Sequence, residues 1–269
     1  MPKPLPPPKQ RWNWRMTGSV FVGVALLAGA AWGGKGVNSF LLRDPRFGLD
    51  CVFPPTATTQ PSCANLEIRG AQYANRSRIF SVFAADFGKS VFNMPLAERR
   101  SHLLAVDWVN TASISRVWPN RLVVNLTERR PVAFAKLPVG ATGRYRMALI
   151  DADGVLLSIP ARVRFHLPVL SGVTEEQPEA DRKARVAAMQ HMLDDLGPQS
   201  KDISEINATN VQDLRVIASI NNEAVELWIG DQHYRSRYTR FLSFYEEIRK
   251  HSGQANVFDL RLDDRILAK

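Results

Sequence analysis

The chain has 269 residues, of which 45% are hydrophobic and 23% charged, and its formal net charge is +9. This composition excludes a wholly disordered chain, and two cysteines are too few for a disulfide-dense miniprotein or a four-cysteine zinc site. The length allows one long or two modest folded domains. Four basic residues and no acidic one lie in the first 15 positions, so the rest of the chain carries too dispersed a charge excess to predict nucleic-acid binding.

The N-terminal residues predict a cytoplasmic tail followed by a membrane anchor. Residues 1–15 are rich in proline and basic residues, which favours an extended tail. Residues 16–34 contain no ionisable side chain, and as a helix they would measure about 28 Å, close to the hydrocarbon thickness of a bilayer. Flanking tryptophans and the preceding cations predict a cytoplasmic N-terminus with residues 35–269 outside. A cleaved signal peptide, with Ala28-Gly29-Ala30 near its cleavage site, is the alternative, and it also exports the body.

Within that stretch, Ala25, Gly29 and Gly33 recur every four residues, a spacing that lets a second helix approach closely. Glycine and alanine are common in membrane helices in any case, so composition alone is the preferred explanation. Weak self-association is kept as a secondary expectation.

Residues 35–63 predict a linker, because prolines recur along it and its centre is rich in Thr and Gln. Cys51 and Cys63 bracket that centre. In an oxidising compartment they are expected to form a disulfide that closes a small loop, and two unpaired thiols are the alternative.

The region after Cys63 predicts the order strand, helix, helix, strand, strand. We expect Trp118 and Pro119 to be structural, and Arg116 to face solvent or to pair with Glu128 across the hairpin. The elements are a strand at Leu66–Arg69 ended by Gly70, a helix carrying Ile79, Phe80, Phe83 and Phe87, a helix starting near Pro95 with the stripe Leu96, Leu103 and Leu104, and strands Val109–Val117 and Leu122–Glu128.

Beyond Pro131 the pattern predicts a β-rich region that contains two helices. The first helix is expected to bury Val186, Met189, Leu193 and Leu196, and the second Tyr238, Phe241, Leu242, Tyr245 and Ile248. The predicted strands are Tyr145–Asp151, Val155–Ile159, Leu214–Ile220, Ala224–Ile229 and Val257–Leu267, and the predicted helices are Ala180–Leu196 and Ser236–Lys250.

No constellation for catalysis is visible in the sequence. The five histidines occur singly, without a zinc-binding HExxH spacing, and GxSxG, SxxK and a phosphate-binding glycine loop are absent. The sequence therefore predicts no catalytic residue, no metal ligand and no cofactor.

One set of motifs carries a family resemblance. Its first motifs lie at Trp108 to Ala112, Arg116 to Pro119, Glu128, Arg129 and Pro131. They resemble the POTRA domain of the FtsQ/DivIB family of bacterial cell-division proteins. Further motifs lie downstream, at Leu149-Ile150-Asp151 with Gly154-Val155, at Leu167 to Leu170 with Gly172, and at Asp259-Leu260-Arg261. They are similar to motifs of that family's second, β-rich domain.

The resemblance implies an α+β protein with one transmembrane helix, a POTRA domain of order β-α-α-β-β and a β-rich domain with two helices. The implied domains are a cytoplasmic tail at 1–15, a transmembrane helix at 16–34, a linker at 35–63, a POTRA domain at 64–133 and an FtsQ-type β domain at 134–269.

The same resemblance implies a non-enzymatic scaffold in the cytoplasmic (inner) membrane at the division septum. Its implied partners are FtsB and FtsL, and further FtsK, FtsW and the septal transpeptidase. The alternatives are a POTRA-containing envelope assembly or transport factor, an exported anchored binding module, and an anchored envelope hydrolase.

The predicted binding site is the last strand, Val257–Leu267, because no later strand in the sequence would cover its outer edge. The resemblance implies that this region binds FtsB. Arg261 is expected to pair with a partner carboxylate and Leu262 to fill an apolar contact. The other implied contacts are Phe258, Asp264, Tyr238 and Arg240. The alternative is a strand that is central or capped internally, with Arg261 merely solvated.

Overall fold

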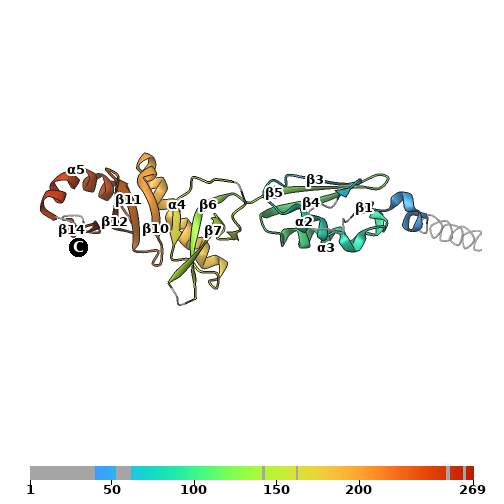
Figure 1. The fold of residues 1–269 in the computed structure, drawn as a ribbon, viewed down its shortest axis with the longest axis horizontal. Helices are drawn as coiled ribbons and strands as arrows, with labels where there is room; N and C mark the ends of the chain where they lie inside the picture. Colours follow the sequence, from blue (N-terminus) through green and yellow to red (C-terminus); the bar gives the residue numbers. More distant parts are fainter. Residues whose placement is uncertain (1–39, 53–61, 141–142, 162, 253–254, 263–264) are drawn as a thin grey trace, which may run out of the picture. The chain divides into compact units, whose positions relative to one another are not determined.

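The structure, a computed structural model, has a mixed α/β fold whose elements form two compact units (Figure 1). We call them the N-terminal unit and the C-terminal unit and describe each by itself. Of the described residues, the N-terminal unit takes in those up to Gly70 together with Arg76–Leu104 and Ala112–Leu126. The C-terminal unit takes in Ala71–Asn75, Ala105–Thr111 and the described residues from Thr127 on.

The predicted tail, the predicted span 16–34 and Asp264 lie outside the residues that the structure describes. Within the described ranges, no helix combines the length and the apolarity needed to cross a membrane. Those ranges are 40–52, 62–140, 143–161, 163–252, 255–262 and 265–269.

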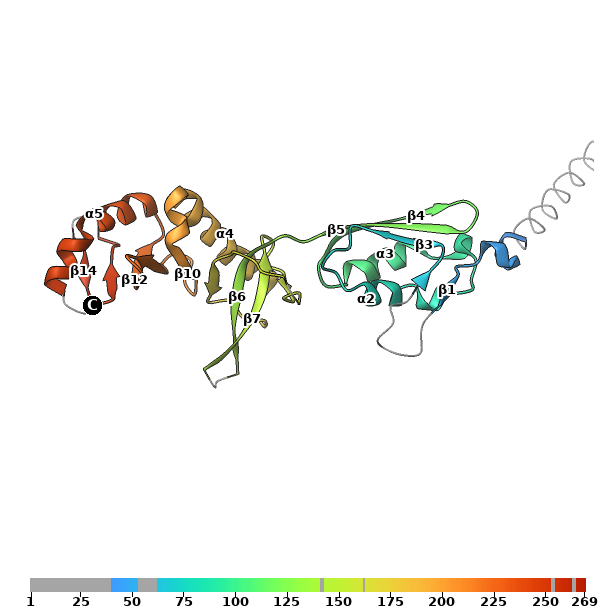
Figure 2. The same ribbon diagram turned by 45° about the horizontal axis from the view of Figure 1, so that its top comes forward.

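The N-terminal unit is built on a three-stranded sheet of order β3-β5-β4, with both helices on one side of it (Figures 1 and 2). The central strand β5 buries Leu122, Val124 and Leu126, and β3 runs parallel to it with Leu66 opposite Leu122. The elements confirm the predicted order: β3 (Leu66–Arg69), α2 (Arg76–Ser81), α3 (Leu96–Leu104), β4 (Val109–Val117) and β5 (Arg121–Glu128).

The prediction of one helix running through Phe87 is wrong. α2 ends at Ser81, a 3-10 turn η2 follows at Ala84–Asp86, and Phe87 is extended. The reason is the buried carboxylate of Asp86, which accepts hydrogen bonds from Arg99 Nε (2.5 Å) and Nη2 (3.1 Å). A buried carboxylate must be paired, and this turn places Asp86 where α3 supplies the guanidinium. The bond with Asp86 raises the pKa of Arg99.

Part of the predicted linker is packed structure. The 3-10 turn η1 (Pro45–Phe47) buries Phe47, and Leu49 is fully buried. The side chain of Asn65 fixes this segment, because its Nδ2 donates to Gly48 O (2.8 Å) and its Oδ1 accepts the Asp50 N–H (2.9 Å). The recurring prolines and the Thr- and Gln-rich centre suggested a linker there, and the long-range contacts of the Asn65 amide were not visible in the local pattern.

The two cysteines lie opposite each other on a short antiparallel pair, β1 (Cys51–Val52) and β2 (Ser62–Cys63). Cys51 and Cys63 form a disulfide in the structure.

A further 3-10 turn, η3 (Val91–Asn93), follows η2 in the same unit.

Of the two predicted alternatives for Arg116, exposure to solvent is confirmed and pairing with Glu128 is wrong. Arg116 donates to the carbonyl oxygens of Val91 and Met94, both at 2.6 Å. Glu128 Oε1 instead accepts three consecutive backbone N–H groups at Gln72–Ala74. Each charged group thus satisfies loop backbone groups that lack a partner in a strand ladder.

The C-terminal unit is built on a nine-stranded mixed sheet of order β14-β13-β12-β11-β10-β9-β6-β7-β8. Three of its neighbouring pairs are parallel: β6 with β9, β9 with β10, and β12 with β13. The strands are β6 (Pro131–Val139), β7 (Arg144–Asp151), β8 (Leu156–Leu157), β9 (Val169–Ser171), β10 (Ile203–Asn207), β11 (Leu214–Ile220), β12 (Glu223–Gly230), β13 (Val257–Asp259) and β14 (Leu267–Ala268).

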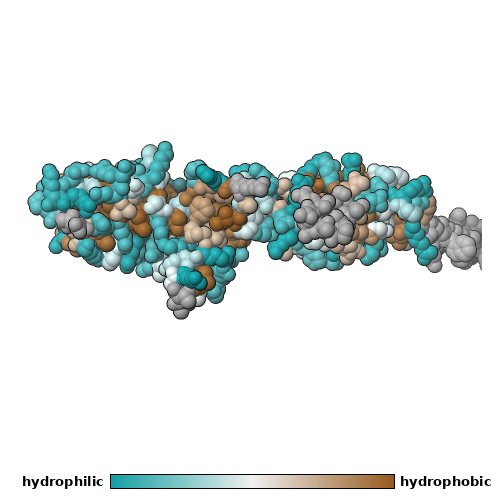
Figure 3. Space-filling view, in the orientation of Figure 1, coloured by the Kyte–Doolittle hydropathy of each residue, from teal (hydrophilic) through white to brown (hydrophobic). Residues whose placement is uncertain are grey.

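Two long helices, α4 (Glu179–Leu196) and α5 (Tyr234–Ser252), share one core with the sheet. Val186 and Met189 of α4 and Phe241 of α5 are fully buried in it, beside alternate residues of the strands. A short 3-10 segment, η4 (Gly197–Asp202), leads from α4 into β10. Apolar side chains are also visible at the surface where α4 and β6 lie (Figure 3).

The sequence predicted both helices and several strands of this unit, but it missed three strands, one of them the nine-residue β6. Strand Leu214–Ile220 is confirmed as β11, and both helices are confirmed within two residues at each end. Of the predicted strand Val155–Ile159 only β8 forms, and Leu193, Leu242 and Ile248 are partly rather than fully buried. Strands β6, β9 and β10 were not predicted.

Gly70, directly after β3, allows a sharp test of this fold. Its φ is +80°, and a Cβ added there would lie 2.0 Å from the carbonyl oxygen of Leu126. Gly88 has a φ of +70° with nothing within 4 Å of an added Cβ, so Gly88→Ala should cost only the backbone strain of about 1–2 kcal/mol. We expect Gly70→Ala to lower the melting temperature clearly more in calorimetry. Equal losses in the two variants would contradict the close approach of β3 and β5.

Candidate functional site

The predicted strand Val257–Leu267 is not continuous, and the prediction that it forms an uncovered edge is wrong. It divides into β13 and β14, and β14 folds back antiparallel onto β13 with Ala268 opposite Phe258. The turn begins at Asp259, whose Oδ1 accepts the backbone N–H of Arg261 at 3.2 Å. Aspartate side chains compete with strand ladders in this way, so the chain leaves the sheet.

Among the described strands, β14 is therefore the outermost on this side of the sheet. Lys269 N–H donates to Val257 O at 2.9 Å, toward β13. Because backbone groups alternate in direction along an antiparallel strand, the N–H and C=O of Ala268 point away from β13. Leu267 is 41% exposed.

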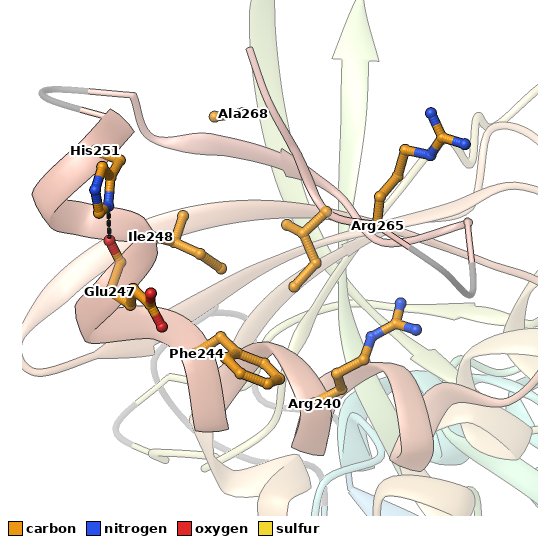
Figure 4. A pocket seen from close by; sticks show the side chains of 8 residues that line it. Arg240, Phe244, Glu247, Ile248, His251, Arg265 and Ala268 are labelled. Atoms are coloured by element: carbon orange, nitrogen blue, oxygen red, sulfur yellow. Dashed lines mark hydrogen bonds between the residues drawn. The ribbon is translucent and has the colours of Figure 1, made fainter.

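A groove of about 490 Å³ lies between α5 and this C-terminal segment (Figure 4). Phe244, which is 51% exposed, forms part of its apolar lining with Ile248 and Ile266. The polar lining comes from both walls: Arg240, Glu247 and His251 on α5, and Arg265 on the C-terminal segment. His251 Nδ1 lies 2.9 Å from the carbonyl oxygen of Glu247.

Two of the predicted contact residues are core residues. Phe258 is fully buried, with its ring centroid 5.2 Å from that of Phe241. Tyr238 is also fully buried, and its hydroxyl contacts Asp202 Oδ2 at 3.2 Å. Burial raises the pKa of Tyr238. Neither side chain is accessible to a partner in this conformation, because aromatic residues on the covered side of a strand or helix pack inward.

The structure brings Arg240 and Leu262 together. Arg240 Nη2 donates to the carbonyl oxygen of Leu262 at 2.7 Å, and the Leu262 side chain is 44% exposed. This bond ties the C-terminal segment to α5 at one end of the groove.

Arg261 is engaged within the chain, not free for a partner carboxylate as predicted. Its Nε and Nη2 donate to the two carboxylate oxygens of Asp259 at 2.9 and 2.6 Å, and its Nη1 lies 3.4 Å from Asp213 Oδ1. These bonds lower the pKa of Asp259 to about 2 and raise that of Arg261. An Arg261→Glu substitution would place a third carboxylate beside two others, so it would test local folding as much as binding.

An indole on β12 joins this network. Three cations lie over the ring of Trp228: Lys269 Nζ at 3.2 Å from its centroid, Arg215 at 4.0 Å and Arg261 at 5.0 Å. Lys269 also contacts Asp259 Oδ2 at 3.4 Å. Trp228 and Asp259 together hold Lys269, the residue after β14.

Sequence reasoning missed Phe244, Trp228 and Lys269. Phe244 does have a signature in the sequence, since a large apolar residue lies outside the stripe of Tyr238, Phe241 and Tyr245 that faces the core. Within the described residues, no group of His, Cys, Asp and Glu side chains is arranged to hold a metal ion.

Comparison with known proteins identifies a matching family model and several relatives. Residues 62–129 match the family model described as "POTRA domain, FtsQ-type". A protein named Cell division protein FtsQ from Koribacter versatilis is 28% identical over 267 residues, which cover 97% of this chain and 72% of that protein. These matches support the resemblance of the chain to the FtsQ/DivIB family.

Other relatives carry the same name. The FtsQ of Geobacter sp. (strain M21) is 25% identical, with 98% of this chain and 93% of that protein covered. That of Novosphingobium aromaticivorans is 28% identical, with 76% of this chain and 59% of that protein covered. The matched POTRA region begins at β2 and takes in the elements from β3 to β5. The relatives indicate a cell-division protein.

Asp259 predicts how the C-terminal segment responds to acid. Its pKa in the folded chain, about 2, lies below the ordinary 3.8, so the ionised carboxylate stabilises the fold. That contribution, on the order of 2 kcal/mol, is complete above about pH 4 and is lost as the pH falls through about 2. We expect Asp259→Asn to destabilise the C-terminal unit at neutral pH and to weaken its acid dependence, as measured by urea unfolding.

Asp194→Asn is the matched control, since it changes an exposed carboxylate on α4. It should leave the acid dependence of unfolding as in the unmodified chain. The same acid dependence in Asp259→Asn as in the unmodified chain would refute this role of Asp259.

Proposed function

We propose that the protein is a non-enzymatic, membrane-anchored scaffold of the division machinery that binds the FtsB/FtsL complex at its C-terminal end. The observation that carries this proposal is the pairing of an outermost strand, β14, with an apolar groove along α5. Main-chain groups at a sheet edge bind an extended segment, and an adjacent groove selects its side chains.

In this proposal a strand of FtsB adds to β14. The outward N–H and C=O of Ala268 bond to its backbone, and an apolar side chain of FtsB packs on Phe244. Arg240 and Arg265 offer positive charge to acidic groups of the partner, while Glu247 disfavours acidic residues nearby. Leu262 supplies a further apolar contact, and Arg261 acts by keeping the C-terminal segment in place. Asp264 belongs to the same proposed surface.

The non-enzymatic part of the proposal rests on chemistry. The lining of the groove mixes apolar, cationic and acidic side chains, and it contains one histidine bonded to its own helix. It offers no activated nucleophile with a base and no set of oxyanion donors.

The remaining partners are assigned to the rest of the chain. We propose that residues 16–34 anchor it in the inner membrane at the septum with residues 1–15 in the cytoplasm, and that the anchor and the POTRA region contact FtsK, FtsW and the septal transpeptidase. Weak self-association through the anchor is part of the same proposal.

Two substitutions test the binding site. Phe244→Glu places a charge in the apolar part of the groove, and Ala268→Pro removes the N–H that points to the open edge while keeping the bond from Lys269. We expect each to reduce copurification of FtsB with the full-length chain at least several-fold and to leave the melting temperature nearly unchanged.

Val211→Glu is the matched control, because Val211 is an exposed hydrophobic residue outside the groove. It should leave copurification of FtsB intact. Full copurification of FtsB with folded Phe244→Glu and Ala268→Pro chains would show that the site lies elsewhere.

The topology is tested separately. Protease added to spheroplasts should digest the body and spare the N-terminal tail, since the cations of the tail resist translocation. A mature chain that began near Ala31 and washed free of membranes would instead establish a cleaved signal peptide.

A further inference from the structure

Four aromatic rings meet at one end of the N-terminal unit. Phe47 is buried at the centre, and the rings of Phe40, Phe92 and Trp118 pack edge-on against it with centroids 5.6, 5.6 and 5.8 Å away. We call these four residues the aromatic tip. They come from three separate segments of the chain: residues 40–47, the turn η3, and the β4–β5 hairpin.

Hydrogen bonds fix these segments to one another. Ser90 Oγ donates to the carbonyl oxygen of Leu41 at 2.7 Å, next to Phe40. Arg116, two residues before Trp118, donates to Val91 O and Met94 O on either side of Phe92. The aromatic tip is therefore a built surface and not a chance approach of flexible side chains.

The tip is unusually exposed for its composition. Trp118 is 71% and Phe40 50% exposed, and the neighbouring Val117 and Leu42 are 44% and 36% exposed. Trp118 is expected from the sequence to be structural, but most of its indole is open. A cluster of exposed apolar side chains marks an interaction surface, and tryptophan in particular prefers the interface between lipid and water.

The chain itself points to lipid as the occupant. Five residues, 35–39, separate Phe40 from Gly34, where the proposed anchor ends, so Phe40 lies within about 22 Å of the end of the span even if the chain between them is fully extended. Trp118 is linked to Phe40 through a single ring, that of Phe47. Arg43 is exposed beside Phe40, and the guanidinium of Arg46 lies 5.5 Å from the centroid of the Phe40 ring. Arg46 is paired with Asp44, so Arg43 is the cation that favours anionic headgroups.

We propose that the aromatic tip lies in the headgroup layer of the membrane that holds the anchor. The N-terminal unit would then have two attachments to the bilayer, the covalent one through residues 35–39 and a second one through Trp118 and Phe40. This proposal rests on the anchor proposed above, and its test separates the two.

The test uses the full-length chain labelled with 5-fluorotryptophan in nanodiscs of phosphatidylethanolamine and phosphatidylglycerol. The chain has six tryptophans, and Trp118→Phe identifies the ¹⁹F signal of Trp118 by its loss. A lipid carrying a nitroxide near its headgroup is then added. We expect the Trp118 signal to lose most of its intensity, as the signals of Trp12, Trp14 and Trp32 do, while that of buried Trp108 keeps its intensity.

Each outcome is decisive. A Trp118 signal that survives while those of Trp12, Trp14 and Trp32 are broadened would overturn the proposal and leave the anchor intact, and it would indicate that the tip faces solvent or a protein partner. Survival of all four signals would overturn the anchor, and with it the proposal. A Trp118 signal that is lost in the unmodified chain but kept in the double variant Phe40→Ser, Arg43→Ser would support the proposal. It would show that residues 40–43 act together with the hairpin.

Discussion

The carboxylate of Asp259 determines how the C-terminal segment folds. It is nearly buried, accepts two side-chain bonds and one backbone bond from Arg261, and lies within ion-pair distance of Lys269. The backbone bond turns the chain out of the sheet, and the contact with Lys269 brings its end back against β13. The outermost strand, the position of Ala268 and one wall of the groove all depend on this one acid and its two cations.

Trp228 links the C-terminal segment to the neighbouring strands of the sheet. The indole on β12 accepts cations from β11, from the turn after β13 and from the residue after β14. Cation–π contacts of this kind contribute on the order of 1 kcal/mol each at a partly exposed site. The four outer elements are thus linked through one aromatic ring in addition to their ladder bonds.

The sequence predicted elements in which one physical pattern dominates. In β11, Leu214, Val216 and Ala218 alternate with outward residues, and this period of two gave the correct bounds. Strand β6 was missed because proline lies at both Pro131 and Pro138 and because its buried residues include Ala133 and Ala135, which have little β-propensity.

The candidate site was harder to predict. Its features depend on contacts between residues that are far apart in the sequence, or on side-chain bonds that break a strand-like alternation. Asp259, Leu260 and Arg261 alternate like a strand, yet the aspartate side chain closes a turn there. The family motif located the correct end of the molecule but assigned to Arg261 a free charge that Asp259 and Asp213 already neutralise. Phe244 was recognisable only as an apolar residue on the wrong side of its helix.

The nine-stranded sheet ends in strands of only two residues at each side, β14 and β8. Edges this short hold very few unpaired main-chain groups, and each bond adds only about 1 kcal/mol to association. Such a sheet resists nonspecific edge-to-edge pairing with other exposed strands, including those of a second copy of the chain. Any segment that stays bound must draw most of its affinity from side chains seated beside the edge, so recognition is governed by sequence rather than by strand-forming tendency alone.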